Sequence, residues 1–556
     1  MNFDMIFLRR PLVLVLMLLL GFFAMNELGY RKLANPDEGR YSEIAREMAA
    51  TGDFVTPRLN GLKYFEKPPM QYWATAAAFS AFGESEFSAR LYTFLCGIAC
   101  LLLIAYTGSR LFDQETGALS VLVLMAAPYF MMLSAIVTLD MGLTFWMTLG
   151  VCSFMLAQTT SSPRECRRWM LLAWAGMAGA VLSKGLIGVV FPAATIFLYC
   201  LLARDFRLLL KLEWLRGLAL FFAIAVPWFA LVSLRNPEFA HFFFIHEHFE
   251  RFLTTSHRRE AAWWFFVPIV FAGFLPWMIA LLPATISGWR SPALPGADGS
   301  TFAPLKFMLL FCAFVLLFFS KSSSKLPAYI LPMFPLLAMV IAVYLKKTKA
   351  RTLSWLLFPL PPLALAGAYA AWIAPAQRFG DDFARQQLYA EMSIWVVAAA
   401  LLIASGTLAA FFALRNGRKW LGIVVVSASI LGTVALIQRG YENISPLQSG
   451  HATAASIGKH LTPDTRLYAV RIYDQSLPYY LKRVFTLVNY VDEFEMGQKT
   501  EPQKYIAQLA DFPAAWNAAG PAIAIIQPGD IESIRALGIA FEVIHQDAKR
   551  VAIKKI

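Results

Sequence analysis

The sequence carries little charge for its length. Only 15% of its 556 residues are charged, whereas 58% are hydrophobic. Soluble globular domains carry about 25% charged residues, so this composition excludes a water-soluble globule and predicts a polytopic membrane protein. The formal net charge is +13. Because the Lys and Arg residues lie in short clusters between apolar runs, this excess predicts membrane orientation and contact with membrane lipids, and we expect no nucleic acid partner.

Cysteine and the common nucleotide motifs are also scarce or missing. The six cysteines all lie within or beside apolar runs, and none follows residue 440. This distribution excludes a disulfide framework and a cysteine-based metal site. The chain has no Walker loop, no dinucleotide-binding glycine fingerprint and no Gly-x-Ser-x-Gly elbow. Chemistry on soluble nucleotides therefore has no support in the sequence.

The sequence is rich in apolar runs long enough to cross a membrane. We predict about 13 transmembrane helices, each close to the length that hydrocarbon requires. The first run follows Arg9 and Arg10 without a small-residue cleavage site, so we expect it to remain as an uncleaved span. The predicted spans are residues 9–28, 88–107, 117–137, 141–158, 169–182, 186–203, 217–234, 263–283, 306–320, 327–345, 353–373, 392–414 and 420–438.

One apolar run, residues 71–83, is too short for a span and is predicted to be an interfacial segment. With this run left out and the N-terminus inside, four basic clusters face the cytoplasm, as the positive-inside rule requires. Counting it as a span would put all four outside. The clusters lie at residues 164–168, 204–216, 346–351 and 415–419. This topology places the first loop and the C-terminal segment together on the outer side of the membrane.

The composition changes after residue 440 to that of a soluble domain, large enough for one core. The predicted fold class is therefore mainly α: a transmembrane domain followed by a small α/β domain outside the membrane. We place the transmembrane domain at residues 1–439, with its first outer loop at 29–87, and the α/β domain at 440–556. Within the latter we predict strands at 466–473 and 521–527, a helix at 502–518 and a hairpin at 541–556.

A dense group of charged residues follows the first span, where residues 35–41 read Asn-Pro-Asp-Glu-Gly-Arg-Tyr. Asn35 suits an N-cap and Pro36 a first helical position, so we predict an interfacial helix over residues 36–50. Asp37 could serve only to cap this helix. Asp140 favours a functional site over simple helix capping. It is a lone carboxylate in a short gap between two spans, where an unpaired charge is costly and usually functional. Two acids at one membrane edge indicate a site.

Further charged residues lie on the same side. Glu66 and Lys67 stand side by side before two prolines, which fits either a solvated turn or contact with lipid head groups. Lys184 lies between apolar stretches and must meet an anion, a carbonyl or water, unless it only snorkels. A lipid phosphate is the natural partner.

The later outer loops are basic. Arg251 follows His246 and His248, and arginine suits phosphate because its donors form a bidentate fork, although a polybasic surface patch would look the same. Lys325 ends a Lys-Ser-Ser-Ser-Lys stretch with the same character. A glutamate and a histidine together form a ligand set that zinc or manganese accepts. We prefer Glu66 with one of the two histidines, while a plain surface loop remains open.

These motifs resemble those of integral-membrane glycosyltransferases that use polyprenyl-phosphate sugars, the glycosyltransferase-C class. Within it the chain is similar to the bacterial lipid A aminoarabinose transferases. The resemblance rests on the motif at residues 35–41, on Tyr-Phe-Glu-Lys-Pro-Pro at residues 64–69, on Asp140 and on the many-span body with an outer C-terminal domain.

The resemblance implies transfer of 4-amino-4-deoxy-L-arabinose from undecaprenyl phosphate to a lipid A phosphate of lipopolysaccharide, with inversion of the anomeric centre. It also implies that the site and the C-terminal domain face the periplasm of a bacterial inner membrane, and that the product gives resistance to polymyxin and cationic antimicrobial peptides. It implies that Asp37 and Asp140 are the catalytic acids. Glu66 and His246 would hold a divalent metal, with zinc the best match. The implied lipid-phosphate site comprises Arg40, Tyr41, Lys67, Lys184, Arg251 and Lys325.

Two other functions are compatible with parts of the sequence. A protein O-glycosyltransferase of the same class would move a sugar from a polyprenyl carrier to Ser or Thr, and would need a peptide groove in place of a basic cavity. A lipid transporter or flippase would be expected to show internal repeats and charges near mid-membrane. The chain shows no repeat, and its charges gather at one face.

Overall fold

The computed structural model describes residue 21 and residues 27–250, 261–295, 301–379 and 382–556. By its internal contacts the chain divides into two units. We call Tyr92–Gly440 the helical unit, and Leu28–Leu91 together with Tyr441–Ile556 the loop–tail unit. The sequence-based division also ends the membrane part near residue 440. The sequence-based division assigned the first loop to the membrane part. The contacts instead group this loop with the C-terminal segment.

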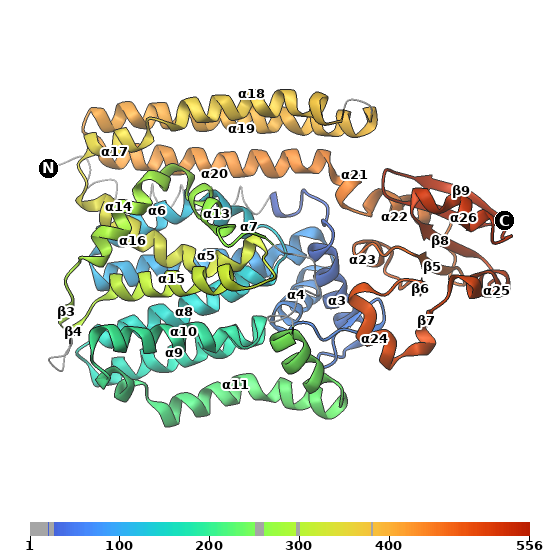
Figure 1. The fold of residues 1–556 in the computed structure, drawn as a ribbon, viewed down its shortest axis with the longest axis horizontal. Helices are drawn as coiled ribbons and strands as arrows, with labels where there is room; N and C mark the ends of the chain where they lie inside the picture. Colours follow the sequence, from blue (N-terminus) through green and yellow to red (C-terminus); the bar gives the residue numbers. More distant parts are fainter. Residues whose placement is uncertain (1–20, 22–26, 251–260, 296–300, 380–381) are drawn as a thin grey trace. The chain divides into compact units, whose positions relative to one another are not determined.

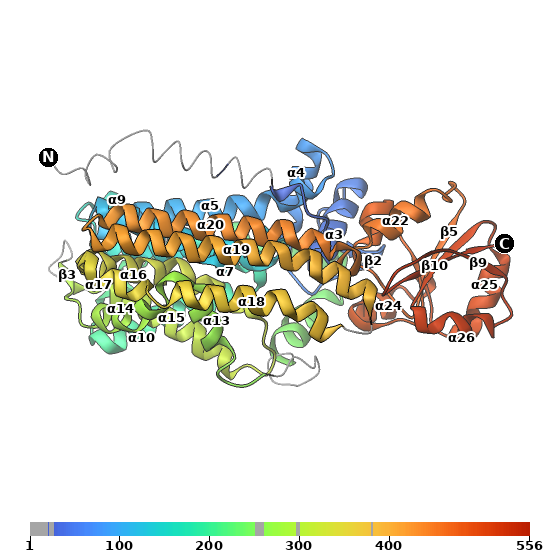
Figure 2. The same ribbon diagram turned by 90° about the horizontal axis from the view of Figure 1, so that it is seen from above.

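The helical unit consists of long apolar helices that run side by side (Figures 1 and 2). Among the described residues, eight helices are long and apolar enough to cross a membrane, or nine if a pair bent by 94° counts as one. They include α5 (Glu86–Leu111), α8 (Leu139–Thr159), α11 (Trp214–Arg235), α15 (Pro304–Lys321), η4 with α16 (Pro327–Met333 and Phe334–Lys347), α17 with α18 (Ala350–Leu357 and Leu360–Arg378), α19 (Phe383–Arg415) and α20 (Lys419–Asn443).

The first predicted span falls almost wholly outside the described residues, and each later one falls on helical chain. Residues 117–137 form two helices, α6 (Gln114–Met125) and α7 (Pro128–Leu133), since Pro128 starts a new helix after a short break. Residues 263–283 are the bent pair, α13 (Phe266–Gly273) and the segment containing η3 (Leu275–Trp277) and α14 (Met278–Trp289).

Close packing of two helices positions two charged residues of the helical unit. Helix α9 (Pro163–Lys184) packs along α8 and is followed by α10 (Ile187–Ala203). A Cβ atom added to Gly176 of α9 would lie 2.6 Å from the backbone nitrogen of Gly150 in α8. Only a residue without a side chain allows this approach, as is common where membrane helices pack backbone to backbone. The contact sets the position of Asp140 on α8 relative to Lys184 on α9.

The loop–tail unit is built from the first loop and a mixed sheet. The loop contains α3 (Asp37–Thr51), the strands β1 (Arg58–Leu59) and β2 (Leu62–Lys63), and α4 (Met70–Phe82). The six-stranded sheet has the order β7-β6-β5-β8-β10-β9, in which the first four strands are parallel to one another and β10 is antiparallel to both its neighbours (Figure 1). Its strands are β5 (Arg466–Val470), β6 (Thr486–Val488), β7 (Tyr505–Ile506), β8 (Ala522–Ile526), β9 (Phe541–Gln546) and β10 (Val551–Lys555).

Most sequence-based expectations for this unit are confirmed. The helix expected at residues 36–50 is α3, the short apolar run is α4, and the two strands and the terminal hairpin are present. The helix expected at 502–518 is wrong in its first part: only α25 (Phe512–Ala518) is helical beyond single turns, because a proline at 513 can start a helix but not lie inside one. Strand β6 was not expected, since three residues leave no period to detect.

Candidate active site

The helix that carries Asp37 begins differently from the sequence-based expectation. Helix α3 starts at Asp37, Pro36 occupies the N-cap position, and no side chain caps the helix. The prediction of Asn35 as the cap is therefore wrong. Its side-chain amide instead donates to Oδ2 of Asp474 at 2.7 Å, and its backbone N–H donates to the carbonyl of Gln448 at 2.7 Å. Two bonds to the C-terminal segment thus hold the residues that lead into the helix.

Glu38 is a buried counter-ion. Its side chain is 2% exposed and lies between the guanidinium groups of Arg31, at 2.9 Å, and Arg90, at 2.8 Å. Burial alone would raise the pKa of Glu38, but the two positive charges overcome that effect and lower it to about 2. Asp37, one residue earlier, keeps 43% of its side chain exposed. Of these two adjacent acids, Asp37 is accessible to a ligand and Glu38 serves the structure.

Arg40 joins Asp37 to an acid from the C-terminal segment. Its Nη1 lies 3.3 Å from Oδ1 of Asp37, and its Nε lies 2.6 Å from Oε2 of Glu493. Gln475 donates to the other oxygen of Glu493 at 2.9 Å. Burial raises the pKa of Glu493 to about 7 against the opposing charge of Arg40, and the charge of Glu66 adds to the rise. The cluster therefore holds a carboxyl group that can change its charge near neutral pH.

Three buried tyrosines surround this cluster. Burial raises the pKa of Tyr41, Tyr64 and Tyr72 well above the ordinary value, and the charge of Glu66 contributes to the rise for all three. The phenols are therefore protonated and can donate. The hydroxyls of Tyr64 and Tyr72 are buried and have no hydrogen-bond partner in the described part of the chain. Because an unpaired buried hydroxyl is unfavourable, these groups are suited to a polar ligand.

Glu66 and Lys67 follow the short hairpin of the first loop. The Lys67 ammonium donates to the carbonyl of Glu66 at 2.7 Å and lies 3.9 Å from its carboxylate. The described residues contain no group of three His, Cys, Asp or Glu side chains placed to hold a metal ion. His246 lies in η2 (His241–Glu250), a helical stretch rather than the expected loop, and its side chain, like the whole of Arg251, lies outside the described residues. The metal pair of Glu66 and His246 therefore stays a prediction.

The helical unit has a polar cluster of its own at one end of α8 and α9. The Lys184 ammonium donates to Oδ1 of Asp140 and lies 4.5 Å from the centre of the Tyr329 ring in η4. Both charged side chains are nearly buried, at 12% and 11% exposed. The hydroxyls of Tyr129 and Thr138 are buried and have no hydrogen-bond partner among the residues that the structure places. Asp140 is thus paired with Lys184, and the same cluster contains two buried hydroxyl groups that can still donate a hydrogen bond.

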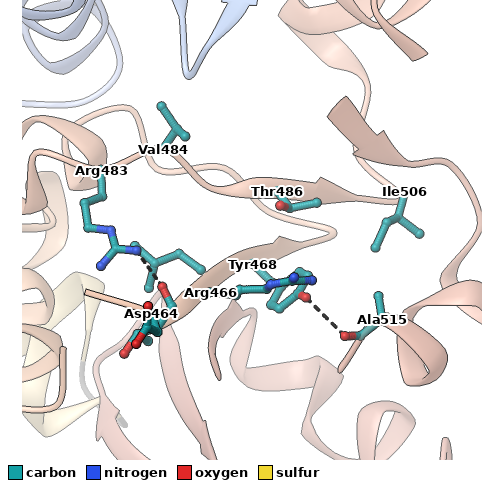
Figure 3. Close-up of a pocket in the computed structure, with 10 residues that line it drawn as sticks. Asp464, Arg466, Tyr468, Arg483, Val484, Thr486, Ile506 and Ala515 are labelled. Atoms are coloured by element: carbon teal, nitrogen blue, oxygen red, sulfur yellow. Dashed lines mark hydrogen bonds between the residues drawn. The ribbon is translucent and has the colours of Figure 1, made fainter. Parts of the chain in front are cut away.

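The sheet of the loop–tail unit also has a hollow, and none of the site residues described above lines it. It has a volume of about 420 Å³ and is lined mainly by residues at the amino ends of β5 and β6, among them Arg466, Thr486 and Tyr468 (Figure 3). Ligands of open α/β sheets bind at the carboxyl ends of parallel strands. Here the segments that follow those ends carry Gln475, after β5, and Glu493, after β6. The hollow is therefore not the candidate site, and the carboxyl ends supply the residues that meet Arg40.

Sequence reasoning found several of these residues and missed others. The loop–tail unit contains Asp37, Arg40, Tyr41, Glu66 and Lys67, and the helical unit contains Asp140, Lys184 and Lys325. Glu493 and Gln475 were missed. The only available signal was an acidic pair at residues 492–493, which gains meaning only once β6 is known to end just before it.

Two families match parts of the sequence. The family described as the aminoarabinose transferase C-terminal domain matches residues 453–555, which include all six strands of the sheet. The family described as dolichyl-phosphate-mannose-protein mannosyltransferase matches residues 6–243, which include Asp37, Asp140 and Lys184. The charged residues of each polar cluster thus fall in regions similar to glycosyltransferases.

Whole-chain comparisons agree. Undecaprenyl phosphate-alpha-4-amino-4-deoxy-L-arabinose arabinosyl transferases from Aeromonas salmonicida and Edwardsiella ictaluri are 32% and 28% identical over 418 and 422 residues, or 72% and 75% of each chain. The crystal structure of ArnT from Cupriavidus metallidurans bound to undecaprenyl phosphate is 32% identical and superposes with a TM-score of 0.92 over 98% of both chains. The similarity therefore extends over nearly the whole sequence and fold.

Proposed function

Since the chain belongs to the family of undecaprenyl phosphate-aminoarabinose arabinosyl transferases, we propose that it transfers 4-amino-4-deoxy-L-arabinose from undecaprenyl phosphate to a phosphate of lipid A. The observation that carries the proposal is the half-exposed Asp37 beside the buried Arg40–Glu493 pair and two unsatisfied tyrosine hydroxyls. Such a cluster combines a reachable carboxylate with donors for a sugar. The proposed setting is the periplasmic face of a bacterial inner membrane, and the product would be lipopolysaccharide with a lower negative charge, which gives resistance to polymyxin and cationic peptides.

The reaction exchanges one bond at the anomeric carbon for another. The bond from the sugar C1 to the donor phosphate breaks, and its electron pair leaves with undecaprenyl phosphate. An oxygen of the acceptor phosphate forms the new bond to C1 from the opposite side, which inverts that centre. Negative charge grows on the departing phosphate, so cations aimed at it lower the barrier. We propose Lys67, Lys184 and Arg251 for this role.

The chemistry of the acceptor group determines whether Asp37 must act as a general base. A phosphate monoester is largely ionised at neutral pH, with a second pKa of about 6, so it can attack C1 without a base. A Ser or Thr hydroxyl would need one. We therefore assign Asp37 to orientation of the bound sugar, whose 4-ammonium group is its natural partner.

The charge balance of the first-loop cluster supports this assignment. When all are ionised, the carboxylates of Asp37, Glu66 and Glu493 outnumber the cations Arg40 and Lys67 by one. That excess negative charge attracts an ammonium group more strongly than it attracts a neutral sugar. An ammonium beside Glu493 would also favour its ionised form, which counteracts the effect of burial.

We keep the divalent metal as part of the proposal. Glu66 supplies one carboxylate donor, and His246 would supply a nitrogen; zinc accepts both. When bound, such a metal would neutralise charge on a phosphate. Metal analysis of the purified protein and of Glu66→Ala tests the ligand pair: the variant is expected to lose the metal, and unchanged content would remove Glu66 from the set.

A transfer assay with purified protein tests the proposed function and its nearest rival together. The donor is undecaprenyl phosphate-linked aminoarabinose, and the acceptors, offered separately, are lipid A and a Ser/Thr peptide. We expect sugar on lipid A and none on the peptide. Transfer to the peptide alone would favour a protein O-glycosyltransferase, and movement of the donor lipid without transfer would favour a transporter.

A further inference from the structure

The turn of the terminal hairpin, just before β10, carries a buried arginine. Arg550 is 1% exposed, and its Nε lies 2.7 Å from Oδ2 of Asp474. Its Nη1 donates to the carbonyl of Ser449 at 2.7 Å and to Oδ2 of Asp547 at 3.1 Å. A buried guanidinium is stable only when acceptors and opposite charges surround it, so these contacts fix the position of Arg550.

The same groups bind Asn35, which lies two residues before Asp37. The side-chain amide of Asn35 donates to Oδ2 of Asp474 at 2.7 Å, the oxygen that also faces Arg550. Its backbone N–H donates at 2.7 Å to the carbonyl of Gln448, one residue before the carbonyl that Arg550 binds. Asn35 and Arg550 thus share a carboxylate oxygen and hold two consecutive carbonyl groups, although they come from opposite ends of the chain.

The second oxygen of Asp474 fixes the segment that packs against the first turn of α3. Oδ1 accepts a hydrogen bond from the backbone N–H of Ser476 at 3.0 Å. A Cβ atom added to Gly39 would lie 2.6 Å from this same nitrogen, so Ser476 lies directly against the helix. Asp474 therefore acts on both sides of Asp37, through Asn35 before it and through Gly39 after it.

This arrangement matters because the position of Asp37 depends on its backbone. The side chain of Asp37 is 43% exposed and stands at the first position of α3. In enzymes, a shift of about 1 Å in a group that orients the substrate can lower the rate by about a hundredfold. Contacts that hold the backbone before and after Asp37 are therefore suited to set its position.

We propose that Arg550 is a positioning residue of the transfer reaction and acts on Asp37 through Asp474 and Asn35. The proposal rests on the proposed function, in which Asp37 orients the sugar by its 4-ammonium group. At 1% exposed, Arg550 does not reach a substrate itself. Without its guanidinium, the buried carboxylate of Asp474 loses its counter-charge, and the hydrogen bond to Asn35 shifts with it.

A double-mutant cycle in donor selectivity tests this route. The full chain in lipid nanodiscs is given the aminoarabinose donor or its 4-hydroxy analogue, and the ratio of the two kcat/KM values is measured. This ratio does not depend on the fraction of folded enzyme, so a merely structural role would leave it unchanged. We expect it to fall by about tenfold in Arg550→Met and in Asn35→Ala, as for loss of a hydrogen bond to a charged group. The double variant should show no further fall, whereas losses that multiply would overturn the route through Asn35.

Two more variants complete the kinetic test. Arg483→Met is the matched control, because Arg483 also donates to backbone carbonyls of this unit, while none of its hydrogen bonds in the described part of the chain reaches the first loop. Its selectivity should equal that of the wild type. Arg550→Lys keeps the charge but not the forked guanidinium, so it should give an intermediate ratio, and it carries the test if Arg550→Met does not fold.

Hydrogen exchange without substrate supplies a measure that is independent of turnover. We expect the backbone N–H groups of residues 33–41 to exchange faster in Arg550→Met than in the wild type, with no change in Arg483→Met. Wild-type exchange and wild-type selectivity in the Arg550 variants would overturn the proposal. If the wild-type chain transfers no aminoarabinose, the proposed function fails, and the exchange rates still decide whether Arg550 holds the segment before Asp37.

Discussion

Asp37 and Glu38 are neighbours in the sequence but occupy opposite environments. Nothing in the order of the two acids tells which one is accessible, because that depends on Arg31 and Arg90, which the fold brings to Glu38 from both sides. The sequence therefore located the acidic pair, and the structure divided its roles. The same holds for Arg40, which looks like a cation for phosphate in the sequence and is paired with two carboxylates in the structure.

Glu38→Gln should destabilise the loop–tail unit. Removing one partner of a buried ion pair costs about 3–5 kcal/mol, because the remaining guanidinium groups stay buried without a counter-charge. The folded-state pKa of Glu38 is about 2 against an ordinary 4.5, so its stabilisation is present above pH 4.5 and is lost as the pH falls towards 2.

Thermal unfolding as a function of pH checks this expectation. The variant should unfold at a lower temperature at neutral pH and show a weaker loss of stability in acid. Glu495→Gln is the control, because Glu495 forms an exposed pair with Lys499. Equal unfolding temperatures for wild type and Glu38→Gln would show that the buried triad does not stabilise the fold.

Glu493 should give the reaction a pH dependence near neutrality. Its pKa is about 7, and its ionised form is the one that attracts an ammonium group. We therefore expect kcat/KM to rise as the pH increases through about 7 and this rise to disappear in Glu493→Gln. The acceptor phosphate also titrates near pH 6, so the comparison with the variant isolates the carboxyl group. An unchanged profile in the variant would remove Glu493 from sugar binding.

At the scale of elements, the start of α3 depends on the C-terminal segment. Asn35 bonds to Asp474, which is itself paired with the buried Arg550 at 2.7 Å. Gly39 lies directly against the backbone of this segment: a Cβ atom there would be 2.6 Å from the nitrogen of Ser476. The helix that carries Asp37 is thus held at its first turn by residues more than 400 positions away.

Gly39→Ala should therefore disturb the site without touching a charged group. The added methyl group cannot be accommodated unless the backbone moves, and overpacking of this kind typically costs about 1–3 kcal/mol. We expect a lower unfolding temperature and a lower kcat. Gly458→Ala is the control, because no atom lies within 4 Å of a Cβ atom at that position. If Gly39→Ala behaves like the control, the packing of α3 on the tail does not position Asp37.

The elements that sequence patterns predicted correctly are those with a local cause. Long apolar runs predicted the apolar helices, and turn residues with apolar strands predicted β5, β8 and the terminal hairpin. Residues 502–518 and β6 failed because short elements take their shape from the sheet rather than from their own pattern. Glu493 could not be found for a related reason: its partner Arg40 lies in another part of the sequence, and only the folded loop–tail unit brings the two together.

At the scale of the whole molecule, the first loop belongs with the tail by its contacts, although the sequence places it between two spans. The family match of the tail therefore falls in the same loop–tail unit as residues 28–91 of the N-terminal family match, whose remaining described residues lie mainly in the helical unit. An account of the activity must include both, since Asp37 and Glu493 come from opposite ends of the chain.

Mass spectrometry of lipid A tests the central claim most directly. Lipid A is compared between cells that lack the gene, cells that express the wild-type chain and cells that express Asp37→Asn at the same level. We predict added aminoarabinose only with the wild-type chain, and loss or strong reduction with Asp37→Asn. Unmodified lipid A in cells with the wild-type chain and a supply of donor, or full modification by Asp37→Asn, would contradict the account.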